Sequence, residues 1–366
     1  MFHSDMINSR ITGPTPLPPS SLEYIHQQMM SHRSESFKKT FANVQCGLQE
    51  LLETNSLPLL FTSSGTAAME SAVNNLLAPN DRALTLSCGF YGDLFHQMVE
   101  RKLNKNAVLL RSPDGCGIDI QYLVDILKQH TFKAIFLTHS ESSTGVVNPL
   151  SEIISAIKSY SDAYIVVDSI SSMGCVNLPF DSLGMDILIG VTQKGLMSPP
   201  GMSIILASER AIEESKVMSN YGSVAFNYAK AQSLAGDFQT LTTPSLHAFW
   251  GLENALGLMR QQGFENVFYH HNNIANHSRL LAELNGFKLF AKEGYRSNTI
   301  TAIELNNKFR ATELAQQLLN NFSITVGIGN GNLTESIIRI AHMGYVNQNE
   351  ITDVYTALAK CKSLYV

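Results

Sequence analysis

Apolar runs and amphipathic segments alternate along the first two thirds of the chain. Short runs of Leu, Ile, Val and Phe occur at residues 58–64, 82–88, 107–112, 133–140, 163–171, 186–194 and 202–208. Segments with apolar residues at helical spacing lie between them, at residues 65–78, 91–102, 119–129 and 150–160. Strands that alternate with helices predict a mainly parallel sheet with helices on both faces. Continuous apolar strands, rather than alternating ones, are expected when both faces are buried.

The pattern changes at both ends of this α/β region. Residues 1–19 end in the proline-rich stretch GPTPLPP and predict an extended N-terminal arm. Helical spacing then runs through residues 20–54. After residue 244 comes a long helical segment, followed by further helical segments and strand-like runs at 287–291, 298–305 and 336–342. We therefore predict a large α/β domain over residues 20–245 and a smaller α+β domain over residues 246–366.

Composition narrows the range of partners. The 366 residues are 44% hydrophobic, and their net charge is −5 with no basic stripe, so nucleic acid is not expected as a partner. The apolar runs have the length of strands, so no membrane span is predicted, and the N-terminus lacks the apolar segment of a signal peptide. The five cysteines are scattered and form no CxxC or metal-ligand cluster. They predict reduced thiols in a cytoplasmic protein with no metal site.

Candidate chemistry lies where the predicted strands end, since ligands of open α/β sheets bind beyond the carboxyl ends of the strands. Ser64, Gly65 and Thr66 follow the first strand and open a helix, which suits an anion such as phosphate but is also compatible with an ordinary helix cap. Gly89-Phe90-Tyr91-Gly92 follows the second strand and offers an aromatic ring for stacking, or a core aromatic. A hydroxyl-rich loop, residues 140–145, follows the strand at 133–140.

Two charged residues end buried-looking strands. Asp168 follows AYIVV, and its carboxylate needs a partner there, either as a helix cap or against a protonated ring nitrogen. Lys194 interrupts the apolar stretch from residue 186 to 206. It either extends to the surface or is desolvated so that its amine can form a Schiff base. A lysine, an acid and an anion-binding helix start (the anion cup, Ser64-Gly65-Thr66) on one sheet edge together fit pyridoxal phosphate.

The motifs that carry these residues resemble one family. TSSGTAAMESA, CGFYGD, THSESSTGVVNPL, IVVDSISSMG, DILIGVTQKGLMSPPGMSII, TTPSLHAFWGL and IIRIAHMG stand in this order over most of the chain. The sequence resembles class V, fold-type I aminotransferases of the alanine–glyoxylate, serine–pyruvate and 2-aminoethylphosphonate–pyruvate group. This resemblance implies a homodimer with shared active sites and pyridoxal 5'-phosphate as cofactor.

The resemblance also implies residue roles. Lys194 forms the Schiff base and moves the proton, and Asp168 keeps the pyridine nitrogen protonated. Arg339, in IIRIAHMG, binds the substrate carboxylate; a guanidinium fork matches a carboxylate in two hydrogen bonds, although a surface ion pair is the alternative. The other cofactor contacts implied are Tyr91 on the ring, Ser143 near the ring hydroxyl, Ser64, Gly65, Thr66 and Gln193 on the phosphate, and Thr242 or Thr243 from the partner subunit.

One assigned arginine implies a substrate with one carboxylate. We expect transamination between a small amino acid, of the alanine or serine type, and pyruvate or glyoxylate. A 2-aminoethylphosphonate–pyruvate or phosphoserine-type aminotransferase is the alternative, and it needs a further cation, for which Arg33 is a candidate. A lyase also stays open. A cysteine desulfurase is disfavoured because Gln193 stands where such enzymes usually carry His, and only Cys361 lies in the last third of the chain.

Overall fold

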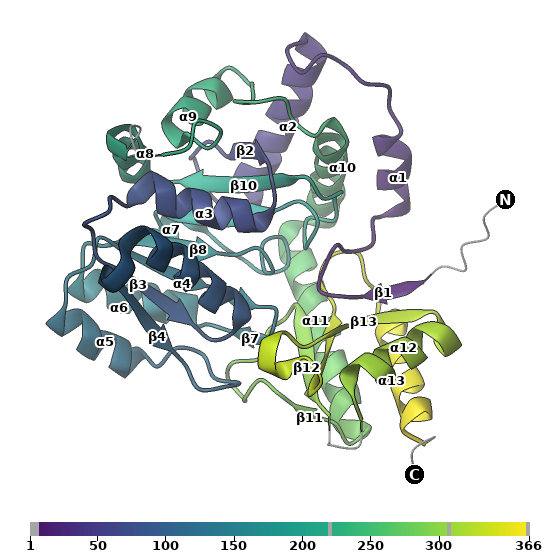
Figure 1. Cartoon of the computed structure of the whole chain (residues 1–366). Coiled ribbons are helices and arrows are strands. Elements are labelled where there is room, and N and C mark those ends of the chain that lie inside the picture. Colours follow the sequence, from purple (N-terminus) through teal and green to yellow (C-terminus); the bar gives the residue numbers. More distant parts are fainter. Residues whose placement is uncertain (1–6, 219–221, 306–308, 364–366) are drawn as a thin grey trace.

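The computed structural model describes residues 7–218, 222–305 and 309–363. It contains a large helix-covered sheet and a smaller one beside it (Figure 1). The strands of the larger sheet are, in spatial order, β2 (Leu59–Thr62), β10 (Met202–Ala207), β9 (Ile187–Val191), β8 (Tyr164–Asp168), β5 (Ala134–Thr138), β3 (Ala83–Ser87) and β4 (Ala107–Arg111). Only β10 runs antiparallel to its neighbours in this sheet, and this confirms the mainly parallel α/β architecture.

Helices bury both faces of the larger sheet, as the continuously apolar strands predict. One core combines alternate strand residues such as Leu84 and Leu137 with α2, α5, α6 and α10. The other core takes the intervening residues, such as Phe136 and Val166, with α3, α4, α8 and α9. The bounds of these helices are α2 (Glu35–Leu51), α3 (Gly65–Leu76), α4 (Phe90–Leu103), α5 (Ile120–Gln129), α6 (Leu150–Tyr160), α8 (Glu209–Val217), α9 (Tyr228–Gly236) and α10 (Leu246–Gln262).

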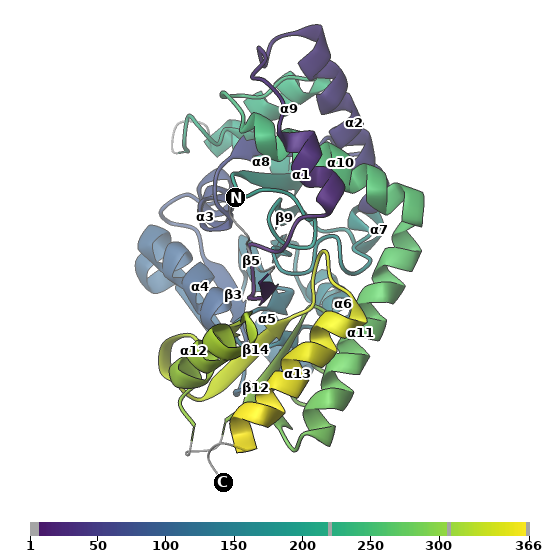
Figure 2. The same cartoon turned by 90° about the vertical axis from the view of Figure 1, so that its right-hand side faces the viewer.

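The smaller sheet has the order β1 (Asn8–Arg10), β13 (Ile324–Ile328), β14 (Ile337–Ala341), β12 (Ile300–Glu304) and β11 (Lys288–Leu289). It shares a separate core with α11 (Phe264–Leu284), α12 (Ala311–Phe322) and α13 (Gln348–Ser363). Helices α11 and α13 pack side by side (Figure 2). Val267 near the start of α11 belongs to the core of the larger sheet, so this helix joins the two units.

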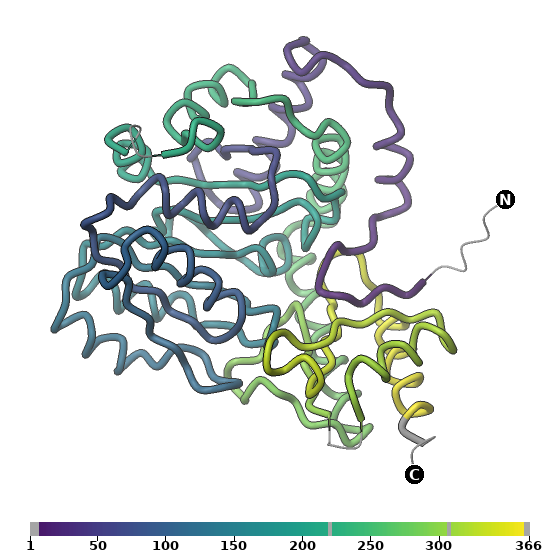
Figure 3. The backbone as a smooth tube through the Cα atoms, viewed as in Figure 1, coloured from purple at the N-terminus to yellow at the C-terminus, as the bar shows by residue number. Residues whose placement is uncertain are grey.

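Two features bear on the predicted domain division, which stays a prediction. The N-terminal arm is partly regular: β1 pairs in parallel with β13, and the chain then crosses to α1 (Pro19–Ile25) on the larger unit (Figure 3). Helix α10, which follows the predicted boundary at residue 245, packs on α2 and contributes Phe249 and Trp250 to the core of the larger sheet.

The other elements in the described part of the chain are short. They are η1 (Asn104–Asn106), the hairpin β6 (Ser140–Glu141) and β7 (Val146–Val147), α7 (Phe180–Leu183) and η3 (Gly331–Leu333). The β6–β7 hairpin leaves the carboxyl end of β5 and brings the hydroxyl-rich loop to the edge where β8 and β9 also end.

Candidate active site

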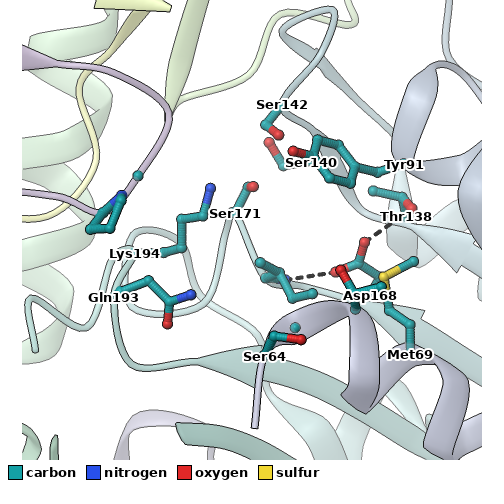
Figure 4. A pocket seen from close by; sticks show the side chains of 15 residues that line it. Ser64, Met69, Tyr91, Thr138, Ser140, Ser142, Asp168, Ser171, Gln193 and Lys194 are labelled. Atoms are coloured by element: carbon teal, nitrogen blue, oxygen red, sulfur yellow. Dashed lines mark hydrogen bonds between the residues drawn. The ribbon is translucent and has the colours of Figure 1, made fainter. Parts of the chain in front are cut away.

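A cavity of about 230 Å³ lies at the carboxyl edge of the larger sheet (Figure 4). Its walls come from the carboxyl ends of the parallel strands β2, β3, β5, β8 and β9, from the segments that follow them, and from the N-terminal loop before α1. The residues that line it are Gly13, Pro14, Ser64, Gly65, Thr66, Met69, Tyr91, Thr138, Ser140, Ser142, Asp168, Ile170, Ser171, Gln193 and Lys194. Seven of the residues selected from the sequence therefore share one cavity, because the parallel strands all end at this edge.

Lys194 stands in the turn between β9 and β10. Thr192 holds this turn, since its hydroxyl donates to Pro199 O at 2.7 Å and its carbonyl accepts from Ser198 N at 3.0 Å. The Lys194 amine reaches across the cavity edge and donates to the carbonyl of Thr12. Desolvation and the nearby Arg339 lower the pKa of Lys194 to about 8, with Asp168 acting in the opposite direction. A substantial neutral fraction of the amine, the form that attacks a carbonyl, is therefore present near neutral pH.

Asp168 is the last residue of β8 and lies opposite Lys194 in the cavity (Figure 4). Its carboxylate accepts from Ile170 N at 2.9 Å and from Thr138 Oγ1 at 3.2 Å. Burial raises the pKa of Asp168 to about 7, and the nearby Glu141 adds to the rise. Among the described residues Asp168 forms no ion pair, and a buried carboxylate in this state favours a protonated ring nitrogen placed beside it.

The cofactor-free protein should lose stability through Asp168 as the pH rises. Because the pKa of Asp168 is raised on folding, its contribution to the free energy of unfolding is greatest below about pH 4 and is lost by about pH 7. The folded and unfolded pKa values differ by roughly three units, which corresponds to a loss of at most about 4 kcal/mol. We expect Asp168→Asn to flatten this part of the pH dependence of the unfolding free energy, measured by urea titration at a series of pH values. The exposed Asp237→Asn is the matched control and should follow the wild type.

The anion cup forms at the start of α3. Ser64 is the N-cap, and its hydroxyl accepts from Ala67 N at 3.2 Å. The N–H groups of Gly65 and Thr66 have no intrahelical partner, as in the first turn of any helix, and both residues line the cavity. Gln193 also lines it, and its buried Oε1 has no hydrogen-bond partner within the described residues. The helix N–H groups, together with the Gln193 amide nitrogen that points toward the cavity (Figure 4), form a set of donors suited to a phosphate group.

A buried glutamate positions the aromatic wall. Glu141 accepts hydrogen bonds at 3.0 Å from the N–H groups of Tyr91 and Gly92, in the first turn of α4, and from Ser143 N at the same distance. A Cβ on Gly89 would lie 2.5 Å from Glu141 Cγ, so only glycine fits there. Burial raises the pKa of Glu141, and these donors act against the rise. Glu141 thus fixes Tyr91 relative to the hydroxyl-rich loop.

Within that loop, Ser143 faces away from the cavity. Its hydroxyl donates to Glu141 Oε1 at 2.6 Å and accepts from Phe90 N at 2.9 Å, so both bonds are internal. Ser140 and Ser142 line the cavity instead and point toward Tyr91 (Figure 4). The role implied for Ser143 stays a prediction. The Ser140 hydroxyl is itself hydrogen-bonded to Ser297 Oγ at 2.8 Å and to Thr299 Oγ1 at 3.1 Å, so the geometry favours Ser142 as the hydroxyl near a bound ring.

Arg339 approaches the site from β14 of the smaller sheet. Its Nε donates to Ile328 O at 2.7 Å, and its Nη1 donates to Ser142 O at 2.9 Å and to Thr12 Oγ1 at 3.4 Å. The residue is only 7% exposed and, within the described part of the chain, forms no ion pair. The surface ion pair considered from the sequence is therefore wrong. Desolvation lowers the pKa of Arg339, and a buried cation of this kind favours binding of a carboxylate.

Three other candidates lie outside the cavity. Thr242 and Thr243 are exposed, and Thr243 O accepts from Thr62 Oγ1 at 3.1 Å. Arg33 donates from Nη1 to Gln239 Oε1 at 2.5 Å and to Thr240 O at 3.4 Å. Neither threonine contributes to this cavity within the single chain, and Arg33 supplies no second cation to it.

Sequence reasoning missed several lining residues. Ser140 and Ser142 stand in the loop it selected, but the direction of each side chain depends on the β6–β7 hairpin. Gly13 and Pro14 belong to the GPTP stretch, which the sequence shows only as an extended arm. The conspicuous Gly-Pro pair was the available signal, although nothing in the sequence places it beside Lys194.

The aminotransferase class-V family model matches residues 20–354. The chain belongs to the class V aminotransferase family. The predicted fold class, the family resemblance and the enzyme class, a pyridoxal phosphate-dependent aminotransferase, are thereby confirmed. Within the described residues of this aminotransferase, none of the helices has the length and apolar character that crossing a membrane requires.

Relatives cover nearly the whole aminotransferase chain. The soluble hydrogenase 42 kDa subunit of Anabaena cylindrica is 30% identical over 97% of this chain and 92% of its own. The serine–glyoxylate aminotransferase of Arabidopsis thaliana is 30% identical over 93% and 86%. Among solved structures, the alanine–glyoxylate aminotransferase of Nostoc sp. superposes with a TM-score of 0.92 at 25% identity, over 98% of this chain and 96% of its own.

Proposed function

We propose that this aminotransferase exchanges the amino group of a small amino acid, of the alanine or serine type, with a 2-oxo acid, pyruvate or glyoxylate. Lys194 is the amine that carries pyridoxal phosphate as a Schiff base. The observation that carries the proposal is the grouping of Lys194, Asp168 and the first turn of α3 around one cavity, with Arg339 buried at its rim. The Arabidopsis relative is named a serine–glyoxylate aminotransferase and the Nostoc relative an alanine–glyoxylate aminotransferase, and both names support this substrate class.

The residues present fit the cofactor. Asp168 is a buried carboxylate facing the cavity, Gln193 directs its amide nitrogen into it (Figure 4), and Gly65 and Thr66 offer free N–H groups. These groups would hold the ring nitrogen and the phosphate, and Tyr91 would lie against the ring. When bound, pyridoxal phosphate supplies an electron sink for the pair left when the Cα–H bond of the substrate breaks.

The chain supplies the proton transfer and the orientation. Lys194, with its pKa lowered to about 8, would accept the proton from Cα and would donate it to the C4′ carbon of the cofactor. Arg339 holds the α-carboxylate through its guanidinium fork, which fixes which Cα–H bond faces Lys194. Its Nε is already bound to Ile328 O, so the guanidinium has a fixed orientation before substrate arrives.

The charges around the cavity support a substrate with one carboxylate. Lys194 is the single cationic side chain among the lining residues, and Arg339 adds one more at the rim. A phosphonate or phosphoserine-type substrate needs a further cation, and Arg33 is occupied by Gln239 and Thr240. A desulfurase needs a mobile cysteine, whereas Cys361 is fully buried in the core around α13.

The assembly we propose is a homodimer with shared active sites. Thr242 and Thr243 are exposed on the single chain, as residues must be that reach a partner's phosphate group. All five cysteines are unpaired thiols, in keeping with the reducing cytoplasm.

A panel of amino donors tests this function. Purified protein loaded with pyridoxal phosphate should transfer the amino group of alanine or serine to glyoxylate or pyruvate, as followed by product chromatography. The panel includes 2-aminoethylphosphonate and phosphoserine. Turnover at least tenfold faster with either of these than with alanine and serine would contradict the proposal in favour of the alternative. Cysteine is added to the panel, and release of its sulfur, or loss of a donor's carboxylate, without amino transfer would indicate a desulfurase or lyase.

A further inference from the structure

Residues 11–15 form a loop that crosses the active site between the two sheets. On one side, β1 anchors it to the smaller sheet by pairing with β13, and the buried Arg10 lies 3.5 Å from Glu350 Oε1. On the other side, Thr15 N donates to Gln193 O at 3.0 Å and Thr15 Oγ1 donates to Lys194 O at 2.9 Å. The loop is therefore held at both ends, and its middle residues lie over the cavity.

Thr12 contacts both charged groups of the proposed mechanism. Its carbonyl accepts from the Lys194 amine, and its hydroxyl accepts from Arg339 Nη1 at 3.4 Å. In the proposed reaction these two groups act on the two ends of the same small molecule, since Arg339 holds the carboxylate and Lys194 acts at Cα. A residue bonded to both therefore bears on their relative position.

Gly13 is needed for this approach. Its φ is +105°, a conformation that other residues rarely adopt, and a Cβ there would lie 2.6 Å from Lys194 Cδ and 2.9 Å from Lys194 Nζ. Any side chain at this position would displace either the loop or the lysine. The absence of a Cβ at Gly13 thus allows the Thr12 carbonyl to reach the Lys194 amine.

We propose that Thr12 and Gly13 are positioning residues of the active site: the Thr12 carbonyl holds the free amine of Lys194, and the Thr12 hydroxyl aligns Arg339 for the substrate carboxylate. The role of Arg339 in this statement rests on the proposed function. The contact with Lys194 does not require it, because it concerns the lysine in the protein without cofactor.

The first test measures the accessibility of Lys194 in cofactor-free protein. The full-length chain is treated at pH 7 with an amine-acylating ester, and acylation of Lys194 is followed by peptide mass spectrometry. We expect Gly13→Ala to increase the acylation rate at least about threefold, because the new Cβ displaces the loop from the amine. The control is Gly294→Ala, where φ is +85° and a Cβ meets nothing within 4 Å. A rate for Gly13→Ala equal to or below that of the control would overturn the role of Gly13.

The second test separates the Thr12 hydroxyl from the carbonyl. Thr12→Val keeps the shape and the carbonyl but removes the hydroxyl, so the Lys194 acylation rate should stay at the wild-type value. The KM for the amino donor should rise about fivefold, because Arg339 is then less well aligned for the carboxylate, with kcat within about twofold. Thr12→Ser should restore the KM. An unchanged KM in Thr12→Val, or a Ser variant that behaves like the Val variant, would overturn the role of the hydroxyl.

The two proposals fail in different ways. If the wild type does not transaminate any donor in the panel, the proposed function fails, while the acylation result for Gly13→Ala still decides the lysine contact. If the wild type transaminates and Gly13→Ala acylates like Gly294→Ala, the function stands and the positioning role of Gly13 is lost.

Discussion

Lys194→Ala should abolish transamination and remove the visible absorbance of protein-bound pyridoxal phosphate. The amine is the attachment point for the cofactor aldehyde in the proposed function, and it is also the group that moves the substrate proton. Loss of the general acid–base role alone lowers kcat by roughly 10²–10⁴-fold, and loss of the attachment point adds to this. Absorbance spectra and steady-state turnover with the best amino donor measure the two effects.

Two further variants make the Lys194 result specific. Lys194→Arg keeps a positive charge, but its guanidinium stays protonated, so it should be as inactive as the alanine variant. The exposed Lys128→Ala should retain wild-type turnover and absorbance. Transamination by Lys194→Ala at a tenth of the wild-type rate or more would rule out the proposed mechanism.

Arg339→Ala should raise the KM for the amino donor at least about 100-fold and leave the cofactor absorbance unchanged. The two charge-assisted hydrogen bonds to a carboxylate that this variant loses contribute roughly 1.5–3 kcal/mol each, and tenfold in affinity corresponds to about 1.4 kcal/mol. Cofactor binding should be unchanged because Arg339 lies at the rim of the cavity, bonded to Ser142 O and Ile328 O, and not in the anion cup at the start of α3. Steady-state kinetics and a cofactor titration measure the two effects separately.

The control for Arg339 keeps the charge and changes the geometry. Arg339→Lys can make only a point contact with a carboxylate, so its KM should lie between the wild type and the alanine variant. The exposed Arg111→Ala removes an arginine elsewhere on the surface and should leave the KM unchanged. Loss of the cofactor from Arg339→Ala, with an unchanged KM, would show that its role is misassigned.

The α/β alternation could be predicted because each strand of the larger sheet is locally apolar. Segments such as 134–138 and 165–168 are buried throughout, and their flanking helices have clear helical spacing. Strand β1 could not be predicted in this way. Asn-Ser-Arg has no apolar run, and it forms a strand because its backbone pairs with β13, more than three hundred residues away.

In the candidate site, too, some residues could be predicted from local sequence and others depend on the tertiary structure. Lys194 and Asp168 were identified because a single charge at the end of an apolar strand is unusual whatever the tertiary structure. The choice between Ser142 and Ser143 depends on the conformation of the turn between β6 and β7, which directs the Ser143 hydroxyl to Glu141 and leaves Ser142 at the cavity. The position of Gly13 over Lys194 depends on the path of a loop between two sheets, which local sequence does not encode.

The pairing of β1 with β13 also affects how the protein is made on the ribosome. Ser9 and Thr325, which are hydrogen-bonded at 3.2 Å, are separated by 316 positions. A nascent chain emerges from its N-terminus, so the strand synthesised first has no partner until β13 has left the exit tunnel. The five parallel strands that end at the cavity can already have assembled by then. The loop over Lys194 is therefore translated before the strands it covers, and it reaches its native place only after β13 is available.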